Sequence, residues 1–469
     1  MALNLSTLTS PATSGDVLAE ALTTADFLEP CPVLRNLSRG SNKGGDAKQD
    51  VALNQPKALP LIKNPQGNLG GYLYIPDVSG NYATGPSVTI GSNETWEGEV
   101  DVVITQFGNY FMPMGGSDWT AGFGLLMYGG GNIRVFSKGI VSASNPSGIT
   151  LGTPVNIKYG FGSIGLYVKI NDVIVSQTTA SQSDSITHPL ELNQQTLTQQ
   201  GNFAIQKAKL TVNNAVVFDC DFNGSTSIRH GDTKFQASVG GPVSLTKAGN
   251  DPVSVVKKSV LRFDGANSSF QGLFNQTITE GYMFAAFSVL GDGGSGSNRI
   301  VSFNSTGTTD VSNLSYIAAY GGGTFLYTFR GGAGNITEHV GSYDEANGDV
   351  LFENKFTAST QLSRVNNADL KTNTENLSSI SSEEFNVGSD TVGSSNAAID
   401  LEFLALFAAD SVPDEATASK IRNYINNRNN VFDLKDGFGY YFYDAQKAPV
   451  GNISSGSSSW NGRIVGSDN

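Results

Sequence analysis

The sequence predicts an all-β protein built from two antiparallel sandwiches in tandem, and three observations carry this prediction. Turn-forming residues are abundant, because 55 of the 469 residues are glycine while only 15% are charged. Short apolar runs alternate with polar residues along most of the chain. Two-residue turn signals separate several of these runs, which is typical of hairpins in a sandwich or jelly roll.

Charge and cysteine content exclude several classes of protein. The net charge is −13, and an acidic surface repels phosphate, so we expect no nucleic-acid partner. The two cysteines, Cys31 and Cys220, lie far apart and do not form a disulfide framework. No apolar run approaches the roughly 20 residues that a membrane-spanning helix needs, so we expect no membrane insertion.

Residues 1–68 are expected to form an extended docking arm. Five prolines lie between residues 30 and 65, and proline fixes φ and removes a backbone donor. Apolar side chains in the segments 34–37 and 58–62 need a surface to pack on, either on the same chain or on a neighbouring subunit. The alternative interpretation is a disordered leader.

We expect residues 69–224 to form the first sandwich, because strand and turn signals recur there at short spacing. From Glu99 to Ile104 apolar and polar residues alternate, which places one apolar face toward a core. Two-residue hairpins are expected at Asn171-Asp172 and Asn213-Asn214, since these residue types tolerate positive φ. Residues 225–259 are expected to bridge the two sandwiches.

Residues 260–432 are expected to form the second sandwich. The segment Val260–Asn267 predicts its opening strand, and Ile399–Phe407 predicts a closing strand. A short edge helix is expected from Ser411 to Arg428, because a serine cap, an early proline and two acidic residues mark its start. Residues 433–469 form an aromatic and then Ser/Gly-rich tail.

A short repeated sequence indicates that the two halves are related. Leu126–Gly131 and Ala318–Gly323 both end in Tyr-Gly-Gly-Gly, and each follows an apolar run and precedes another. Glycine is common in this chain, so the tetrapeptide alone is a weak signal. The matching context makes it a sign of two similar domains.

Three segments carry a resemblance to a known superfamily. Leu261–Gly265, together with the strand from Ile399 and the helix starting at Asp414-Glu415, resembles laminin-G-like domains of the concanavalin-A-like lectin and glucanase superfamily. The resemblance implies a jelly-roll fold for each sandwich. Laminin-G-like domains often bind calcium through loop carboxylates and carbonyls, so it also implies calcium as a cofactor to consider.

A second resemblance concerns the order of the strands over roughly residues 70–432. The run from Leu73 to Phe222, followed by Gly240 to Phe263, is similar to tandem jelly-roll structural proteins of tailed bacteriophages. It implies a protein at the virion surface, as a fibre, spike or capsid decoration. We further expect a homo-oligomer that contacts other virion proteins through its N-terminal arm and touches cell-surface glycans weakly.

One row of acids is the candidate for catalysis. Glu97, Glu99 and Asp101 alternate along one predicted strand and therefore share a face, with neighbours about 6.7 Å apart. Glucanases of the superfamily carry three alternating acids, but in the order Glu-x-Asp-x-Glu. The order here is Glu-x-Glu-x-Asp, so the family's nucleophile and acid roles are not carried over. The alternative is a solvated strand face.

Aromatic residues beside polar groups are the candidates for binding sugars, because a sugar ring offers apolar C–H faces and a polar rim. Six residues fit this description: Trp119 beside Asp118, Tyr128 before a glycine loop, and Tyr320 with Asn298 and Arg299. The alternative is that these residues belong to the core or to strand edges.

Metal binding is expected to be limited to calcium. The three histidines are scattered without ligand spacing, which argues against zinc. Asp292 and Asp310 lie in predicted loops and are candidate calcium ligands. Their alternative role is to form turns.

These observations favour a structural protein of a virion and not an enzyme. Two other hypotheses stay open. One is a carbohydrate-active enzyme that uses Glu97, Glu99 and Asp101, and the other is a secreted adhesin.

Overall fold

The computed structural model describes most of the chain between residues 57 and 409. The described residues are 57–59, 61–107, 110–117, 120–129, 131–144, 149–179, 182, 184–193, 202–248, 251–257, 260–265, 270–278, 281–291, 297–304, 315–320, 325–330, 336–341, 350–357, 360–365, 371–373, 382–388, 400–409, 412, 414, 415, 418 and 439–440.

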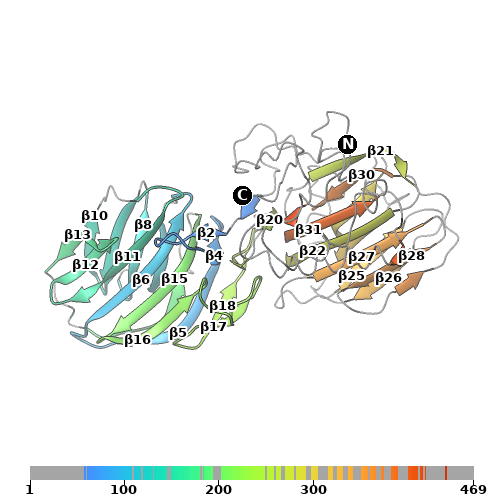
Figure 1. Ribbon diagram of the computed structural model, residues 1–469. Coiled ribbons are helices and arrows are strands. Elements are labelled where there is room, and N and C mark those ends of the chain that lie inside the picture. Colours follow the sequence, from blue (N-terminus) through green and yellow to red (C-terminus); the bar gives the residue numbers. More distant parts are fainter. Residues whose placement is uncertain are drawn as a thin grey trace. The chain divides into compact units, whose positions relative to one another are not determined.

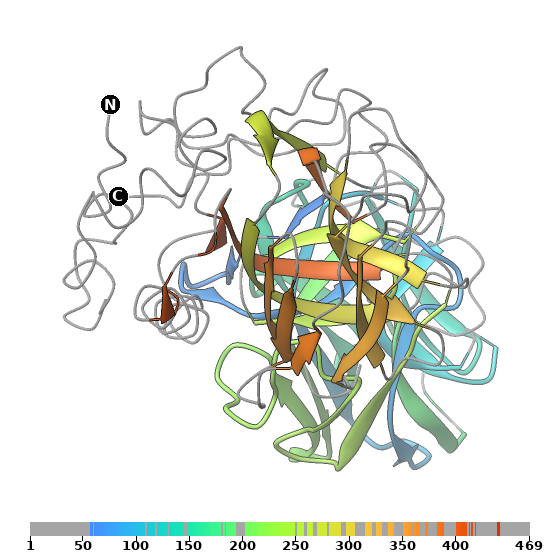
Figure 2. The ribbon, with the colours of Figure 1, turned by 90° about the vertical axis from the view of Figure 1, so that its right-hand side faces the viewer.

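The chain divides into two compact units. Leu61–Lys257 is called the first sandwich here, and Met1–Pro60 with Lys258–Asn469 the second. Strands of the first sandwich are coloured from blue to green in Figure 1, and those of the second are mainly yellow to orange-red (Figures 1 and 2). The elements that the described residues form are strands in both units, which confirms the predicted all-β class.

The first sandwich consists of two eight-stranded sheets and a small ribbon. Sheet I has the order β13 (Val173–Thr178), β12 (Gly165–Ile170), β11 (Pro154–Gly162), β6 (Trp96–Ile104), β15 (Phe203–Val212), β4 (Tyr72–Ile75) and β19 (Ser254–Val256), with β16 (Ala215–Asp221) also paired to β15. Sheet II has the order β10 (Ile140–Ser144), β9 (Asn132–Ser137), β8 (Phe123–Tyr128), β7 (Tyr110–Gly116), β14 (Ile186–Leu192), β5 (Tyr82–Ile90), β18 (Pro242–Thr246) and β17 (Lys234–Gln236). The ribbon pairs β2 (Ile62–Lys63) with β3 (Leu69–Gly70).

The second sandwich has an eight-stranded and a six-stranded sheet. Sheet III has the order β1 (Lys57–Leu59), β20 (Val260–Asp264), β31 (Asp400–Ala409), β22 (Gly281–Gly291), β27 (Val350–Phe356), β28 (Gln361–Val365) and β29 (Lys371–Asn373), with β32 (Gly439–Tyr440) parallel to β31. Sheet IV has the order β21 (Phe270–Ile278), β30 (Ser382–Val387), β23 (Ser297–Asn304), β24 (Ser315–Tyr320), β25 (Phe325–Arg330) and β26 (Ile336–Gly341).

Side-chain alternation on β6 builds the core of the first sandwich. Val100, Val102 and Ile104 are fully buried in a cluster that both sheets supply, as the alternating pattern predicts. The buried Tyr159 of β11 contributes from the same face of sheet I, and its hydroxyl donates to the carbonyl of Met114 in sheet II at 2.8 Å. This hydrogen bond satisfies a polar group inside an apolar core and ties the two sheets together.

Both predicted hairpins are present, and their backbone angles explain the residue types. Asn171 and Asp172 have φ of 47° and 65°, and Asn213 and Asn214 have φ of 47° and 64°. Two successive positive φ angles define a type I′ turn, whose twist matches that of the flanking strands. These turns join β12 to β13 and β15 to β16.

The expectation that residues 225–259 form a bridge between sandwiches is wrong. They supply β17, β18 and β19, which pair within the first sandwich. Val243, Val253 and Val255 are fully buried there, so removing these strands would open the core. Gly240 and Gly241, both at φ 100°, reverse the chain between β17 and β18.

The segment predicted as an extended arm contributes strands where it is described. Lys57–Leu59 forms β1 and pairs antiparallel with β20. Ile62–Lys63 and Leu69–Gly70 form the ribbon of the first sandwich, so the arm does not extend to residue 68. Residues 1–56 lie outside the described part of the chain.

The strands predicted to open and to close the second sandwich are paired with each other. In β20 and β31 the register pairs Leu261 with Phe403 and Phe263 with Leu401. Most of the helix expected at 411–428 lies outside the described residues. Within it, the amide of Ala418 donates to the carbonyl of Asp414 at 2.9 Å, and Ala418 is buried.

Among the described residues of the second sandwich, a balanced ionic cluster surrounds the buried Glu353. Tyr282 donates to this carboxylate at 3.0 Å, and Arg364 also binds it. Lys355 lies 3.6 Å from Glu353 and 2.9 Å from Glu415, in the segment of the expected helix. Two cations thus face two carboxylates, which offsets the cost of burying the charge.

Gly98 of β6 is expected to be intolerant of a side chain. A Cβ atom there would lie 2.5 Å from Cζ of the buried Tyr159 ring, which cannot yield because its hydroxyl is bonded across the core. We expect Gly98→Ala to destabilise the first sandwich by about 1–3 kcal/mol through overpacking. Denaturant unfolding followed by fluorescence of the adjacent Trp96 measures this change.

The matched control is Gly129→Ala, since a Cβ atom at Gly129 would have no neighbour within 4 Å. We expect an unchanged unfolding midpoint for this variant. Equal effects of the two substitutions would contradict the packing argument at Gly98.

Candidate functional site

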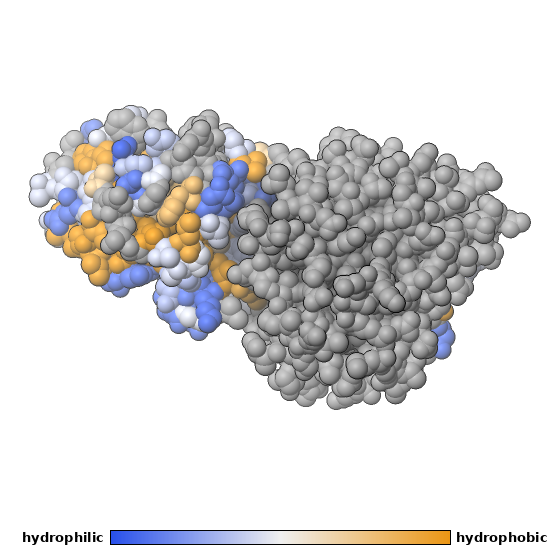
Figure 3. All heavy atoms as spheres, turned by 90° about the horizontal axis from the view of Figure 1, so that it is seen from above, coloured by the Kyte–Doolittle hydropathy of each residue, from blue (hydrophilic) through white to orange (hydrophobic). Residues whose placement is uncertain are grey.

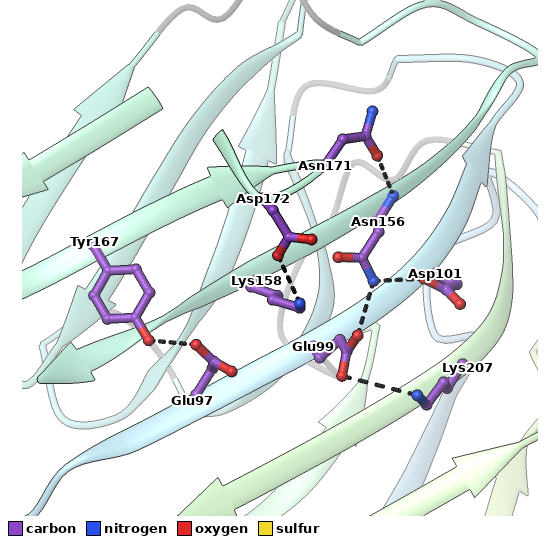
Figure 4. A network of polar contacts seen from close by, with 9 residues as sticks. All are labelled: Glu97, Glu99, Asp101, Asn156, Lys158, Tyr167, Asn171, Asp172 and Lys207. Carbon is purple, nitrogen blue, oxygen red and sulfur yellow. Dashed lines mark hydrogen bonds and ion pairs between the residues drawn. The ribbon is translucent and has the colours of Figure 1, made fainter. Parts of the chain in front are cut away.

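The predicted row of acids lies on the face of sheet I that points away from the core (Figure 4). Glu97, Glu99 and Asp101 alternate on β6 with the buried residues Val100 and Val102. β6 is flanked by β11 and β15, so every acid on it has a neighbour on both sides. The sequence therefore predicts their common face correctly, and the neighbouring strands decide what the acids contact.

Asn156 of β11 bridges two of the three acids. It lies opposite Asp101 in the register, and its Nδ2 donates to Glu99 Oε1 at 3.0 Å and to Asp101 Oδ1 at 2.7 Å. Lys207 of β15 adds an ion pair to Glu99, with Nζ 3.8 Å from Oε2. The space between these two carboxylates is thus occupied by an amide of the protein itself.

Glu97 is engaged separately. Its Oε2 accepts a hydrogen bond of 2.5 Å from the hydroxyl of Tyr167, on β12. Gly160 lies opposite Glu97 on the intervening strand β11, so the tyrosine reaches the carboxylate over a residue without a side chain. Burial and the hydrogen bond to Glu97 raise the pKa of Tyr167, which keeps its hydroxyl a donor at physiological pH.

Cross-strand neighbours on this face are largely of opposite charge. Lys158 and Lys209 lie opposite Glu99, and Lys207 lies opposite Asp101. Lys158 also binds Asp172 at the β12–β13 turn, with a distance of 2.7 Å. Opposite charges across strands stabilise a sheet, so the acids and their lysine neighbours hold the three strands together.

The pKa of Asp101 is raised, mainly because the carboxyl is buried. Its side chain is only 6% exposed, and the hydrogen bond from Asn156 and the charge of Lys207 offset the burial in part. A raised carboxyl pKa is a property that general acids need, and Oδ1 of Asp101 accepts the hydrogen bond from Asn156. The arrangement can hold β6 and β11 in register.

A second cluster lies on the outward face of sheet II. The ring of Tyr128 stacks on that of Tyr110, with centroids 6.0 Å apart and planes 27° apart. The guanidinium carbon of Arg134 lies 5.2 Å from the centroid of Tyr128. We call Tyr110, Tyr128 and Arg134 the aromatic platform. Only Tyr128 is predicted from the sequence, because the others reach it through the register of β7, β8 and β9.

The remaining predicted sugar contacts stay predictions. Trp119 and Asp118 lie outside the described part of the chain. Asn298 and Arg299 lie on β23 and Tyr320 ends β24, where the register pairs Tyr320 with Ser297. Their strands are neighbours, and these three positions stay predictions as a sugar site.

Metal sites have little support within the described residues. No group of three or more histidine, cysteine, aspartate or glutamate side chains there could hold a metal ion. Asp292 and Asp310 lie outside this part, so calcium binding at these two positions stays a prediction. The described residues also contain no helix that is long and apolar enough to cross a membrane.

Comparisons with known proteins give structural neighbours only. No family model and no curated protein matches the chain. Domains LG4-5 of the mouse laminin alpha1 chain match over 80% of this chain and 96% of their own, with 10% identity and a TM-score of 0.24. Trypanosoma rangeli sialidase matches over 67% and 62%, with 8% identity and a TM-score of 0.29.

An arabinofuranosidase complexed with arabinofuranosyl-alpha-1,2-xylobiose matches over 46% of this chain, with 10% identity and a TM-score of 0.28. The match spans about half of that enzyme, 51% of its length. Laminin domains and glycosidases therefore stand side by side among the neighbours.

The raised pKa of Asp101 predicts a specific pH dependence of stability. Between the ordinary pKa of 3.8 and the higher folded value, the folded state binds more protons than the unfolded state. Stability therefore falls as pH rises through this window. The pKa of Asp232 is also raised by burial, so we expect Asp101→Asn to reduce this fall and not to abolish it, as measured by denaturant unfolding at a series of pH values.

Asp172→Asn is the matched control with the opposite sign. The hydrogen bond and charge of Lys158 lower the pKa of Asp172, so its contribution is present above pH 3.8 and is lost as pH falls. Asp172→Asn should therefore leave the decrease above pH 3.8 in place. Wild-type and Asp101→Asn curves with the same slope above pH 3.8 would contradict the assignment to Asp101.

Proposed function

We propose that this protein is a non-enzymatic structural component displayed on the surface of a bacteriophage particle, and that its first sandwich contacts host cell-surface glycans weakly. The observation that carries the non-enzymatic part is that each acid of the row already has a partner within the protein. Asn156 donates to Glu99 and Asp101, Lys207 pairs with Glu99, and Tyr167 donates to Glu97. A glycosidase needs one carboxyl to protonate the leaving group and another to attack or activate water.

Support for glycan contact comes from the exposed aromatic platform. Tyr110 is 48% exposed although it stacks on Tyr128, and a half-exposed aromatic ring beside polar groups suits a sugar ring. A single flat platform predicts weak binding. Several copies on one particle would raise the effective affinity through avidity.

The placement on a virion is supported by the resemblance of residues 70–432 to tandem jelly-roll structural proteins of tailed bacteriophages. The extensive apolar core of the first sandwich suits a protein that must stay folded outside a cell. The N-terminal segment would dock the protein to other virion proteins or to sister copies. Asp292 and Asp310 are the positions at which calcium would bind a loop.

Binding of the full chain to a panel of bacterial surface polysaccharides tests the glycan part, with calcium and with a chelator. We expect selective binding with micromolar or weaker affinity by a monomeric preparation. Loss of binding with the chelator would assign a role to loop calcium. Absence of binding to every polysaccharide would refute the adhesive role, and absence of the chain from purified particles would refute the virion role.

Polysaccharide cleavage tests the enzyme alternative. We expect no cleavage by the native chain, because the carboxylates of Glu99 and Asp101 already accept hydrogen bonds from Asn156. We also expect Glu99→Gln to leave glycan binding unchanged, since an amide preserves an acceptor for Asn156. Release of reducing ends by the native chain, abolished in Glu99→Gln, would replace the structural proposal by a hydrolase.

A further inference from the structure

We propose that the aromatic platform of sheet II binds an acidic sugar, specifically a hexuronate unit of a cell-surface polysaccharide. This inference rests on the proposed glycan contact and names its site and ligand class. The sugar ring would lie on the exposed Tyr110, and its carboxylate would face the guanidinium of Arg134.

The register of three strands places the platform on the outward face. Tyr110 lies opposite Tyr128 on β7 and β8, and Leu126 lies opposite Arg134 on β8 and β9. Phe111 and Met127, which adjoin Tyr110 and Tyr128 in the sequence, belong to the core. Because side chains alternate along a strand, Tyr110, Tyr128 and Arg134 face away from that core.

A small apolar cluster holds the platform in place. Met112, Leu126 and Phe136 on the same face are buried and pack together with Val141. Tyr110 differs from these neighbours because it remains 48% exposed. Figure 3 shows that apolar side chains also lie exposed among polar ones on the visible face of the first sandwich. A buried base beside an exposed ring is what a stacking contact with a sugar requires.

Arg134 gives the platform its preference for an anion. Its Nε is buried without a hydrogen-bond acceptor, and Arg134 forms no ion pair within the described part of the chain. A guanidinium offers five donors and pairs well with a carboxylate. Arg134 lies against Tyr128, whose other neighbour is the exposed ring of Tyr110. A cation and an exposed ring on either side of Tyr128 match a ligand that combines a flat C–H face with a carboxylate.

Another cation and tyrosine pair shows what the platform adds. On sheet I the ammonium of Lys169 lies 4.9 Å from the centroid of Tyr167. That tyrosine is only 8% exposed, and its hydroxyl is bound by Glu97. The pair on sheet I thus offers no open ring, so it serves as an internal control for the contribution of an exposed tyrosine.

Calorimetric titration of the full chain with galacturonate and glucuronate oligosaccharides tests the proposal, each compared with its carboxyl-reduced form. We expect Tyr110→Ala to weaken binding of the acidic sugars on the order of tenfold, while Tyr110→Phe binds as the native chain does. Arg134→Gln should remove the preference for the acidic over the reduced form. Lys169→Gln should change neither binding nor preference.

The outcomes separate this inference from the proposed function. Acidic-sugar binding that Tyr110→Ala and Arg134→Gln leave intact would overturn the site while glycan adhesion stands. Binding of other polysaccharides but of neither uronate series would overturn the ligand class. Binding of no glycan at all would overturn both. Circular dichroism and the thermal midpoint verify that each variant is folded.

Discussion

The two-residue period of β6 is the constraint on which the first sandwich depends. One face of this strand supplies the core, with Gly98 leaving room for the ring of Tyr159, whose hydroxyl binds the opposite sheet. The other face carries the acids. A shift of one residue would bury Glu99 and expose Val100, so the hydrophobic effect fixes the register of this strand and of the strands paired to it.

That register also decides which side chains the acids contact. Asn156 faces Asp101 because β11 is aligned by the same core, and its amide then satisfies two carboxylates that would otherwise repel each other. The polar face of sheet I thus stabilises the sheet through its own contacts. The outward face of sheet II differs, since the ring of Tyr110 is half exposed and Nε of Arg134 has no hydrogen-bond acceptor. The two faces of one sandwich therefore suit different roles.

The residues show why some features are predictable from sequence and others are not. Alternation and paired turn residues are local, so the buried face of β6 and the hairpin at Asn213-Asn214 are both predicted correctly. The segment 225–259 is misjudged as a bridge because its strands are short and pair with β4 and β5, more than 150 residues earlier. Glycines and prolines between such strands resemble a linker when the pairing partners are unknown.

The sequence by itself determined the all-β class, the alternating faces and the turns. These features follow from backbone sterics and from the burial of apolar side chains away from water. Only the tertiary structure decided which side chains meet. Tyr110, Tyr128 and Arg134 come from three strands, and Glu97 finds Tyr167 across a glycine. Such contacts depend on cross-strand register, which the packing of the whole core sets, so no local pattern in the sequence encodes them.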